Sequence, residues 1–213
     1  MKSLAHFIDH TNLSPIAQEK DIKVLCDEAI KYDFVSVCLN PVYVPIAKSF
    51  LKNKNIRVCS VVGFPLGADS AEMKYAEARF LIFNGVDEID MVMNIGSLKE
   101  KRTNIVKNEI KKVVDAAEGK IVKVIIETSL LDNDEKILAS NLVEDCGANF
   151  VKTSTGFSDG GATIEDVKLI KKAVGSQIGV KASGGIKTKA SAISFIEAGA
   201  DRIGTSSGVK IIS

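Results

Sequence analysis

The sequence predicts a single (β/α)₈ TIM-barrel domain that spans residues 1–213. Short runs rich in Val and Ile alternate with longer amphipathic stretches along the whole chain, as expected for parallel strands covered by helices. From the end of the first run at Asp9 to the end of the last at Gly204, the repeat averages about 28 residues, the length of one strand, one loop and one helix. No Pro- or Ser-rich linker divides the chain. An open doubly wound sheet is the alternative, because the first strand is weak and the last helix is short.

Eight short runs are predicted to form the strands, and cap residues mark the helices between them. The expected strands span residues 6–9, 35–39, 57–62, 88–93, 122–127, 150–153, 179–182 and 202–204. Ser14-Pro15 and Asn40-Pro41 each place an N-cap residue before a Pro at the first helical position, so they predict two helix starts. Thr163 precedes a third helical pattern in the manner of a capping box.

Composition and charge exclude several classes of protein. The chain has 28 basic and 27 acidic residues, and its net charge of +1 offers no electrostatic footprint for nucleic acid. The longest strictly apolar run, at 80–83, is far shorter than the roughly 20 residues that a membrane span needs. Four scattered cysteines without a CxxC pair are typical of reduced thiols, so we expect a soluble cytoplasmic protein. Because the chain has only two histidines, we expect no metal site.

Two lysines occupy matching positions in neighbouring predicted strands. Lys152 and Lys181 each stand in the pattern Val-Lys-x-Ser-x-Gly, about one β/α unit apart. Because a barrel carries its active site at the carboxyl ends of its strands, we expect both side chains to point toward the barrel axis near that mouth. Repulsion between the ammonium groups and burial would both lower a lysine pKa, and a neutral amine suits Schiff-base chemistry on a carbonyl. The alternative is that these lysines end edge strands and reach solvent. The residues alone do not indicate which lysine attacks.

Acidic and sulfur-containing residues near the strand ends supply further candidates. Asp90 lies in an otherwise apolar run, where its carboxylate could hold one lysine charged and exchange protons through a bound water. The alternative is that Asp90 forms a structural ion pair with Lys123 or Lys181. Glu127 ends the next run and ranks below Asp90 as a partner for a barrel lysine. Cys38 is expected to stay reduced and non-catalytic, because nothing in the sequence pairs a histidine with it.

The last two predicted strands end in clusters of Gly and Ser. In barrels, the loops after strands seven and eight often form a phosphate site. Here the backbone N–H groups of Gly184 and Gly185 could approach an anion, and the hydroxyl groups of Ser206 and Ser207 could add donors. An ordinary tight turn is the alternative for the Gly-Gly pair. The glycine-rich loop 155–161 is either a mobile cover over the site or a connector.

Four segments resemble those of a known family. They are Ile-Asp-His-Thr-Asn-Leu at 8–13, Glu-Ile-Asp-Met-Val-Met-Asn-Ile-Gly at 88–96, Val-Lys-Thr-Ser-Thr-Gly-Phe at 151–157 and Val-Lys-Ala-Ser-Gly-Gly-Ile at 180–186. In this order, and across nearly the whole chain, the segments resemble the deoxyribose-phosphate aldolase family. The resemblance implies a metal-free class I aldolase on a (β/α)₈ barrel. Such an enzyme reversibly cleaves 2-deoxy-D-ribose 5-phosphate to acetaldehyde and D-glyceraldehyde 3-phosphate, in deoxyribonucleotide catabolism.

The resemblance also implies a role for individual residues. Lys152 would be the Schiff-base lysine, and Asp90 and Lys181 would be the proton-transfer pair. Gly185 would lie at the substrate phosphate together with the two serines at 206 and 207. No metal or organic cofactor is implied, because the iminium formed on the lysine is the electron sink.

Two other interpretations remain open at this stage. The first is another lysine-dependent sugar-phosphate aldolase or transaldolase, and the second is a non-catalytic sugar-phosphate-binding barrel. The expected ligand is in each case a small-molecule sugar phosphate, and we expect a homo-oligomer, with a homodimer as its form. The chain continues for only six residues after Ser207, whereas family members often continue longer. We therefore expect a final helix of one or two turns beside the phosphate site.

Overall fold

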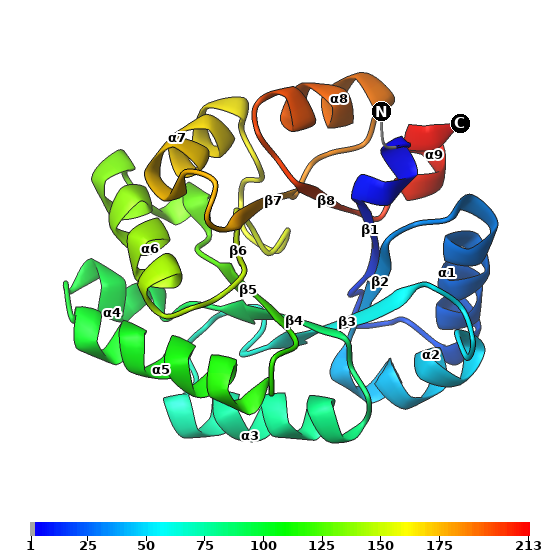
Figure 1. Ribbon diagram of the computed structural model, residues 1–213, viewed down its shortest axis with the longest axis horizontal. Helices are drawn as coiled ribbons and strands as arrows, with labels where there is room; N and C mark the ends of the chain where they lie inside the picture. The colour runs from blue at the N-terminus through cyan, green and yellow to red at the C-terminus, as the bar shows by residue number, and fades with distance from the viewer. Residues whose placement is uncertain (1–2) are drawn as a thin grey trace.

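The computed structural model describes residues 3–213, which form a closed barrel of eight parallel strands (Figure 1). The strands are β1 (Ile8–Asn12), β2 (Ser36–Leu39), β3 (Arg57–Val62), β4 (Glu88–Val92), β5 (Ile121–Ile125), β6 (Phe150–Lys152), β7 (Gly179–Ser183) and β8 (Arg202–Thr205). Each strand pairs with its neighbour in sequence order, and β8 pairs with β1 through Ile8 and Ile203 to close the ring. The predicted (β/α)₈ barrel is therefore confirmed, and closure excludes the open doubly wound sheet.

Helices form a ring outside the strands (Figure 1). The α-helices are α1 (Glu19–Tyr32), α2 (Val44–Phe50), α3 (Ala71–Phe83), α4 (Ile95–Lys99), α5 (Thr103–Ala116), α6 (Asn133–Asp145), α7 (Ile164–Val174), α8 (Lys189–Glu197) and α9 (Gly208–Ile212), and the 3₁₀ helices are η1 (Leu4–Phe7), η2 (Pro41–Tyr43) and η3 (Thr128–Leu130). The final helix, α9, has five residues, which confirms the expected short ending beside β8.

The helix starts agree with two of the three predicted caps. The Thr163 hydroxyl accepts a hydrogen bond from the Asp166 N–H at 3.0 Å, and Asn40 precedes η2, which leads into α2. The prediction of a helix start at Ser14-Pro15 was wrong. The Ser14 carbonyl instead accepts from the Ala17 N–H in a turn, and α1 begins five residues later, behind Gln18. The reason is that β1 runs to Asn12, further than the predicted 6–9, so the connection needs these residues for a turn.

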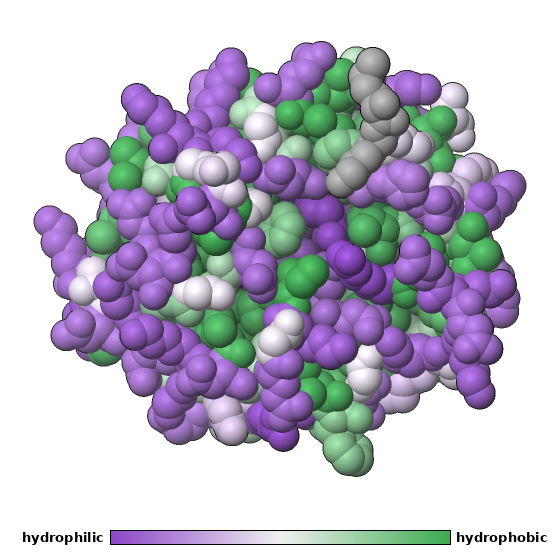
Figure 2. Space-filling model, viewed as in Figure 1, coloured by the Kyte–Doolittle hydropathy of each residue, from purple (hydrophilic) through white to green (hydrophobic). Residues whose placement is uncertain are grey.

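Apolar packing holds the barrel together from the outside. Val124, Val151 and Val180 stand in register on adjacent strands, are fully buried and belong to the core between sheet and helices. Because side chains alternate along a strand, their sequence neighbours point to the barrel axis. Hydrophilic side chains predominate over the face seen in Figure 2 and surround scattered hydrophobic ones. Among the helices of residues 3–213, none is both long and apolar enough to cross a lipid bilayer.

Candidate active site

The axis of the barrel is filled by charged side chains instead of the usual branched apolar ones. Seven of them are almost completely buried, with exposed fractions between 0% and 5%: Asp9, Glu88, Asp90, Lys123, Lys152, Lys181 and Arg202. Strand register brings them together, because Asp90 pairs with Lys123, and Lys181 lies between Lys152 and Arg202 on its two neighbours. We call these seven residues the charge cluster.

Asp90 is the centre of the charge cluster. Its Oδ2 accepts from Lys152 Nζ at 2.8 Å and from Lys181 Nζ at 2.7 Å, while its Oδ1 accepts from Lys123 Nζ at 2.8 Å. The sequence led us to expect one lysine on Asp90, or an ion pair with Lys123 or Lys181, and the structure places Lys152, Lys181 and Lys123 all against this carboxylate. One carboxylate thus holds three ammonium groups at hydrogen-bond distance.

Two further carboxylates of the charge cluster contact Lys181 and Lys123, and one guanidinium joins these carboxylates. Lys181 Nζ lies 2.5 Å from Asp9 Oδ2, and Lys123 Nζ lies 2.6 Å from Glu88 Oε2. Arg202 bridges these two carboxylates, donating through Nε to Asp9 at 2.7 Å and through Nη2 to Glu88 at 2.9 Å. Lys181 therefore has two carboxylate partners and Lys123 has three, counting Asp9 at 4.0 Å, whereas within residues 3–213 Lys152 has only Asp90.

The surrounding charges decide the protonation of the cluster. Burial raises the pKa of Asp90, but the ammonium groups of Lys123, Lys152 and Lys181 outweigh it and hold that pKa well below its usual range. Burial lowers the pKa of Lys181, but the carboxylates Asp9 and Asp90 outweigh it and raise that pKa above its usual value. The expectation that neighbouring lysines lower each other's pKa was therefore wrong for Lys181. The two carboxylates that contact Lys181 lie on β1 and β4, which are distant in sequence from β7. The sequence around Lys181 therefore did not indicate them.

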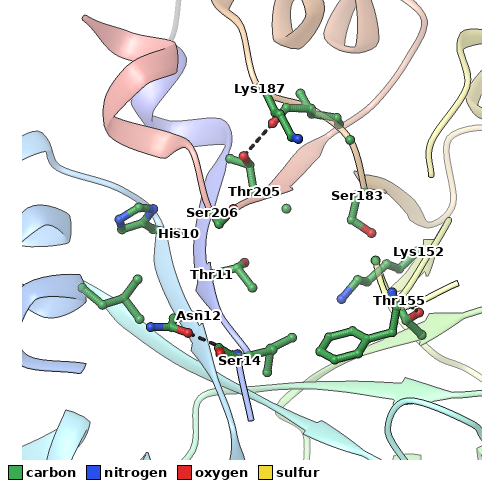
Figure 3. A pocket seen from close by; sticks show the side chains of 18 of the residues that line it. His10, Thr11, Asn12, Ser14, Lys152, Thr155, Ser183, Lys187, Thr205 and Ser206 are labelled. Atoms are coloured by element: carbon green, nitrogen blue, oxygen red, sulfur yellow. Dashed lines mark hydrogen bonds between the residues drawn. The ribbon is translucent and has the colours of Figure 1, made fainter. Parts of the chain in front are cut away.

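A pocket of about 740 Å³ opens above the cluster at the carboxyl ends of the strands. Of the three lysines that contact Asp90, Lys152 lines this pocket and the other two do not. Figure 3 shows Lys152 on one side of the cavity and Thr11, Asn12 and Ser14 on the other. The strand ends thus expose one amine to a cavity large enough for a small substrate and keep the remaining charges beneath it.

The predicted phosphate residues are divided by the structure. Gly184, Gly185 and Ser206 line the pocket, and both glycines have positive φ angles of +89° and +80°, a conformation that favours glycine. Ser207 is not among the lining residues. Its N–H donates to the Thr205 hydroxyl at 2.9 Å, which turns the chain into α9.

Two further expectations concern Glu127 and Cys38. Glu127 does not pair with a barrel lysine. It follows β5 by two residues, and its left-handed backbone, with φ of 51°, leads into η3 while its carboxylate accepts from Thr155. Cys38 is fully buried and, with Cys59 and Asp90, forms a group whose metal-ligating atoms all lie within 4.8 Å of one another. Because three ammonium groups already occupy the Asp90 carboxylate, this set does not fit a divalent cation.

The sequence interpretation missed several members of the site. Asp9, Glu88 and Arg202 had no assigned role, and neither did Lys187, which lines the pocket beside the glycine pair. The alternation of side chains was an available signal for Glu88, because it lies two residues before Asp90 and faces the same side. Arg202 is level with Lys181 only through the register of β7 and β8.

Comparisons with known proteins agree with this geometry. The profile of the DeoC/LacD family aldolases matches residues 4–213. The chain belongs to this family. It is 55% identical to a deoxyribose-phosphate aldolase of Thermococcus kodakarensis over 99% of this chain and 96% of the relative. A relative of the same name from Caldicellulosiruptor saccharolyticus is 57% identical, with 100% of this chain and 98% of the relative covered.

Solved structures of this aldolase family share the fold of the chain. The deoxyribose phosphate aldolase of Aeropyrum pernix, described as a unique tetrameric structure, superposes with a TM-score of 0.92 at 37% identity. The match covers 98% of this chain and 89% of that one. The resemblance read from the four sequence segments is therefore confirmed at the level of the family.

Proposed function

We propose that this DeoC/LacD family aldolase reversibly cleaves 2-deoxy-D-ribose 5-phosphate to acetaldehyde and D-glyceraldehyde 3-phosphate. The names of relatives more than 50% identical over nearly the full length support this substrate. The observation that carries the proposed chemistry is that Lys152 alone, among the three lysines on Asp90, lines the pocket. A lysine amine that meets the substrate carbonyl is the starting point of Schiff-base catalysis.

The partners of each lysine support Lys152 as the nucleophile. Lys181 and Lys123 each contact at least two carboxylates of the cluster, whereas Lys152 contacts Asp90. Lys152 also shares its single carboxylate oxygen with Lys181, so it is the least tightly held of the lysines. After Lys152 gives up a proton, its amine adds to the substrate carbonyl, and the carbinolamine takes up a proton and loses water to give an iminium.

Asp90 and Lys181 are proposed to move protons in the later steps. The low pKa of Asp90 keeps it an acceptor, and the raised pKa of Lys181 keeps it a donor, 2.7 Å from the same carboxylate. The substrate hydroxyl loses its proton to the Asp90–Lys181 pair as the carbon–carbon bond breaks, and the iminium accepts the electron pair of that bond. This releases the phosphorylated aldehyde and leaves an enamine. A proton delivered through this pair to the enamine carbon, followed by hydrolysis, frees acetaldehyde.

The substrate phosphate is proposed to bind at the far end of the pocket. Backbone N–H groups of Gly184 and Gly185, the Ser206 side chain and the Lys187 ammonium supply donors there. Ser207 belongs to the same loop and acts by ordering it ahead of α9. The pocket therefore offers an amine at one end and anion-binding groups at the other.

Trapping with borohydride tests the proposal. In the presence of acetaldehyde, the imine on Lys152 is reduced to a stable secondary amine, which peptide mass mapping locates. We expect the label on Lys152, no label in Lys152→Leu, and turnover of deoxyribose 5-phosphate that persists in excess EDTA. A label on Lys181 would transfer the nucleophile role. Trapping without turnover of this substrate would favour another lysine-dependent sugar-phosphate aldolase.

We also propose that the protein is a cytoplasmic homo-oligomer that acts in deoxyribonucleotide catabolism. The tetrameric relative supports assembly, and so does an apolar stripe on α3. Met73, Phe80 and Phe83 follow helical spacing and are 63%, 52% and 90% exposed. Light scattering should report a dimer or larger assembly for the wild type. The double variant Phe80→Glu/Phe83→Glu should dissociate this assembly, and a monomeric wild type would refute the proposed oligomer.

A further inference from the structure

Glu127 is a buried carboxylate that the proposed reaction does not use. It is 3% exposed and lies outside the charge cluster. Its Oε2 accepts two hydrogen bonds from Thr155, one from the N–H at 3.2 Å and one from the hydroxyl at 2.5 Å. Within residues 3–213, its Oε1 is buried and has no hydrogen-bond partner. Burial of a carboxylate with an unpaired oxygen lowers the stability of the fold. The role of Glu127 therefore lies in the groups that its hydrogen bonds orient.

The two hydrogen bonds orient the loop that follows Lys152. The Thr155 hydroxyl donates to Oε2 of Glu127. A lone pair of the same hydroxyl oxygen then accepts the Phe157 N–H at 3.0 Å. Glu127 therefore fixes the backbone at Thr155 directly and at Phe157 through one intermediate.

This loop forms part of the pocket wall. Thr155, Gly156 and Phe157 all line the pocket, three to five residues after Lys152. The Phe157 ring is half exposed and packs edge-to-face on Phe64, with ring centroids 5.2 Å apart. Phe64 lies in the loop after β3, so this contact joins two loops at the mouth of the barrel. A shift of the 155–157 backbone would open the wall without moving the charge cluster.

We propose that Glu127 is a positioning residue that holds loop 155–157 in the shape that binds the sugar phosphate. It acts through Thr155 and does not itself line the pocket. The inference rests on the proposed aldolase function and adds a determinant of substrate binding to it. Lys152 is held separately, by Asp90 on β4 and by its own strand β6, so imine formation with a two-carbon aldehyde does not depend on Glu127.

The test compares Glu127→Ala with Glu127→Gln. The Ala variant loses the acceptor, whereas the Gln variant keeps a carbonyl oxygen that can accept both Thr155 hydrogen bonds. Loss of a hydrogen bond to a charged group corresponds to a change of about tenfold or more in binding. We expect Glu127→Ala to raise KM for deoxyribose 5-phosphate by about tenfold or more, to trap acetaldehyde at the wild-type rate, and to be rescued by Gln.

Two further variants separate positioning from stability. Glu109→Ala removes another buried carboxylate, which pairs with Lys74 at 2.6 Å away from the pocket, and should lower stability without raising KM. Thr155→Val removes the hydroxyl and should reproduce the KM effect if Glu127→Ala fails to fold. An unchanged KM, an equal rise in Glu109→Ala, or lost trapping in Glu127→Ala would overturn the inference. Failure of the wild type to trap at Lys152 would instead refute the proposed function.

Discussion

Replacement of Asp90 by Asn tests whether the charge cluster is a single energetic unit. The amide keeps the size of the carboxylate but removes the negative charge that three lysines share at 2.7–2.8 Å. Lys123 and Lys181 keep Glu88 and Asp9 as partners, whereas Lys152 loses its only carboxylate. The buried cluster then holds two carboxylates against four cationic groups.

The size of the effect follows from the burial of these groups. Removing one partner of a buried ion pair destabilises a protein by about 3–5 kcal/mol, because the remaining charge is left uncompensated. We expect Asp90→Asn to lower the free energy of unfolding by about this amount, a large part of the roughly 5–15 kcal/mol that a domain commonly has. Loss of a proton acceptor should also slow cleavage by about 10²- to 10⁴-fold.

Urea unfolding at pH 7 and steady-state cleavage measure the two effects. The matched control is Asp115→Asn on the exposed surface of α5, which should change the free energy of unfolding by about 0.5 kcal/mol or less. A stability loss below about 1 kcal/mol for Asp90→Asn would falsify the view that its carboxylate compensates the three ammonium groups.

Three further predictions concern pH, the phosphate loop and a helix cap. The lysines and Arg202 hold the pKa values of Asp90 and Glu88 below their usual range. These carboxylates therefore stabilise the fold above about pH 4, and their contribution is lost as the pH falls through the lowered pKa values. Acid titration should show this loss, with a shallower slope in Asp90→Asn; equal slopes would contradict the linkage. Gly184→Ala should raise KM and lower stability by about 1–3 kcal/mol, because its φ is +89° and the new Cβ would meet backbone at 2.9 Å. Thr163→Ala should cost about 1 kcal/mol in thermal unfolding and leave turnover unchanged; a loss of turnover would indicate a role beyond capping.

The repeat of strands and helices was predictable from the sequence because it depends on local properties. Each run of β-branched residues and each amphipathic stretch reports its own secondary structure, and the β3 bounds agree with the prediction at both ends. The matched frames of Lys152 and Lys181 also located two side chains that meet on one carboxylate. Strand alternation and repeat length were sufficient for this, since both act within one β/α unit.

The partners of each charge were decided by the closed barrel. Asp9 and Arg202 lie at opposite ends of the sequence, yet they are hydrogen-bonded because β8 returns to pair with β1. That closure gives Lys181 a second carboxylate and reverses the expected direction of its pKa shift. Electrostatic energy depends on distances between strands, which no single segment contains. The sequence by itself therefore determined the barrel and its candidate lysines, whereas the tertiary structure decided which amine faces the pocket.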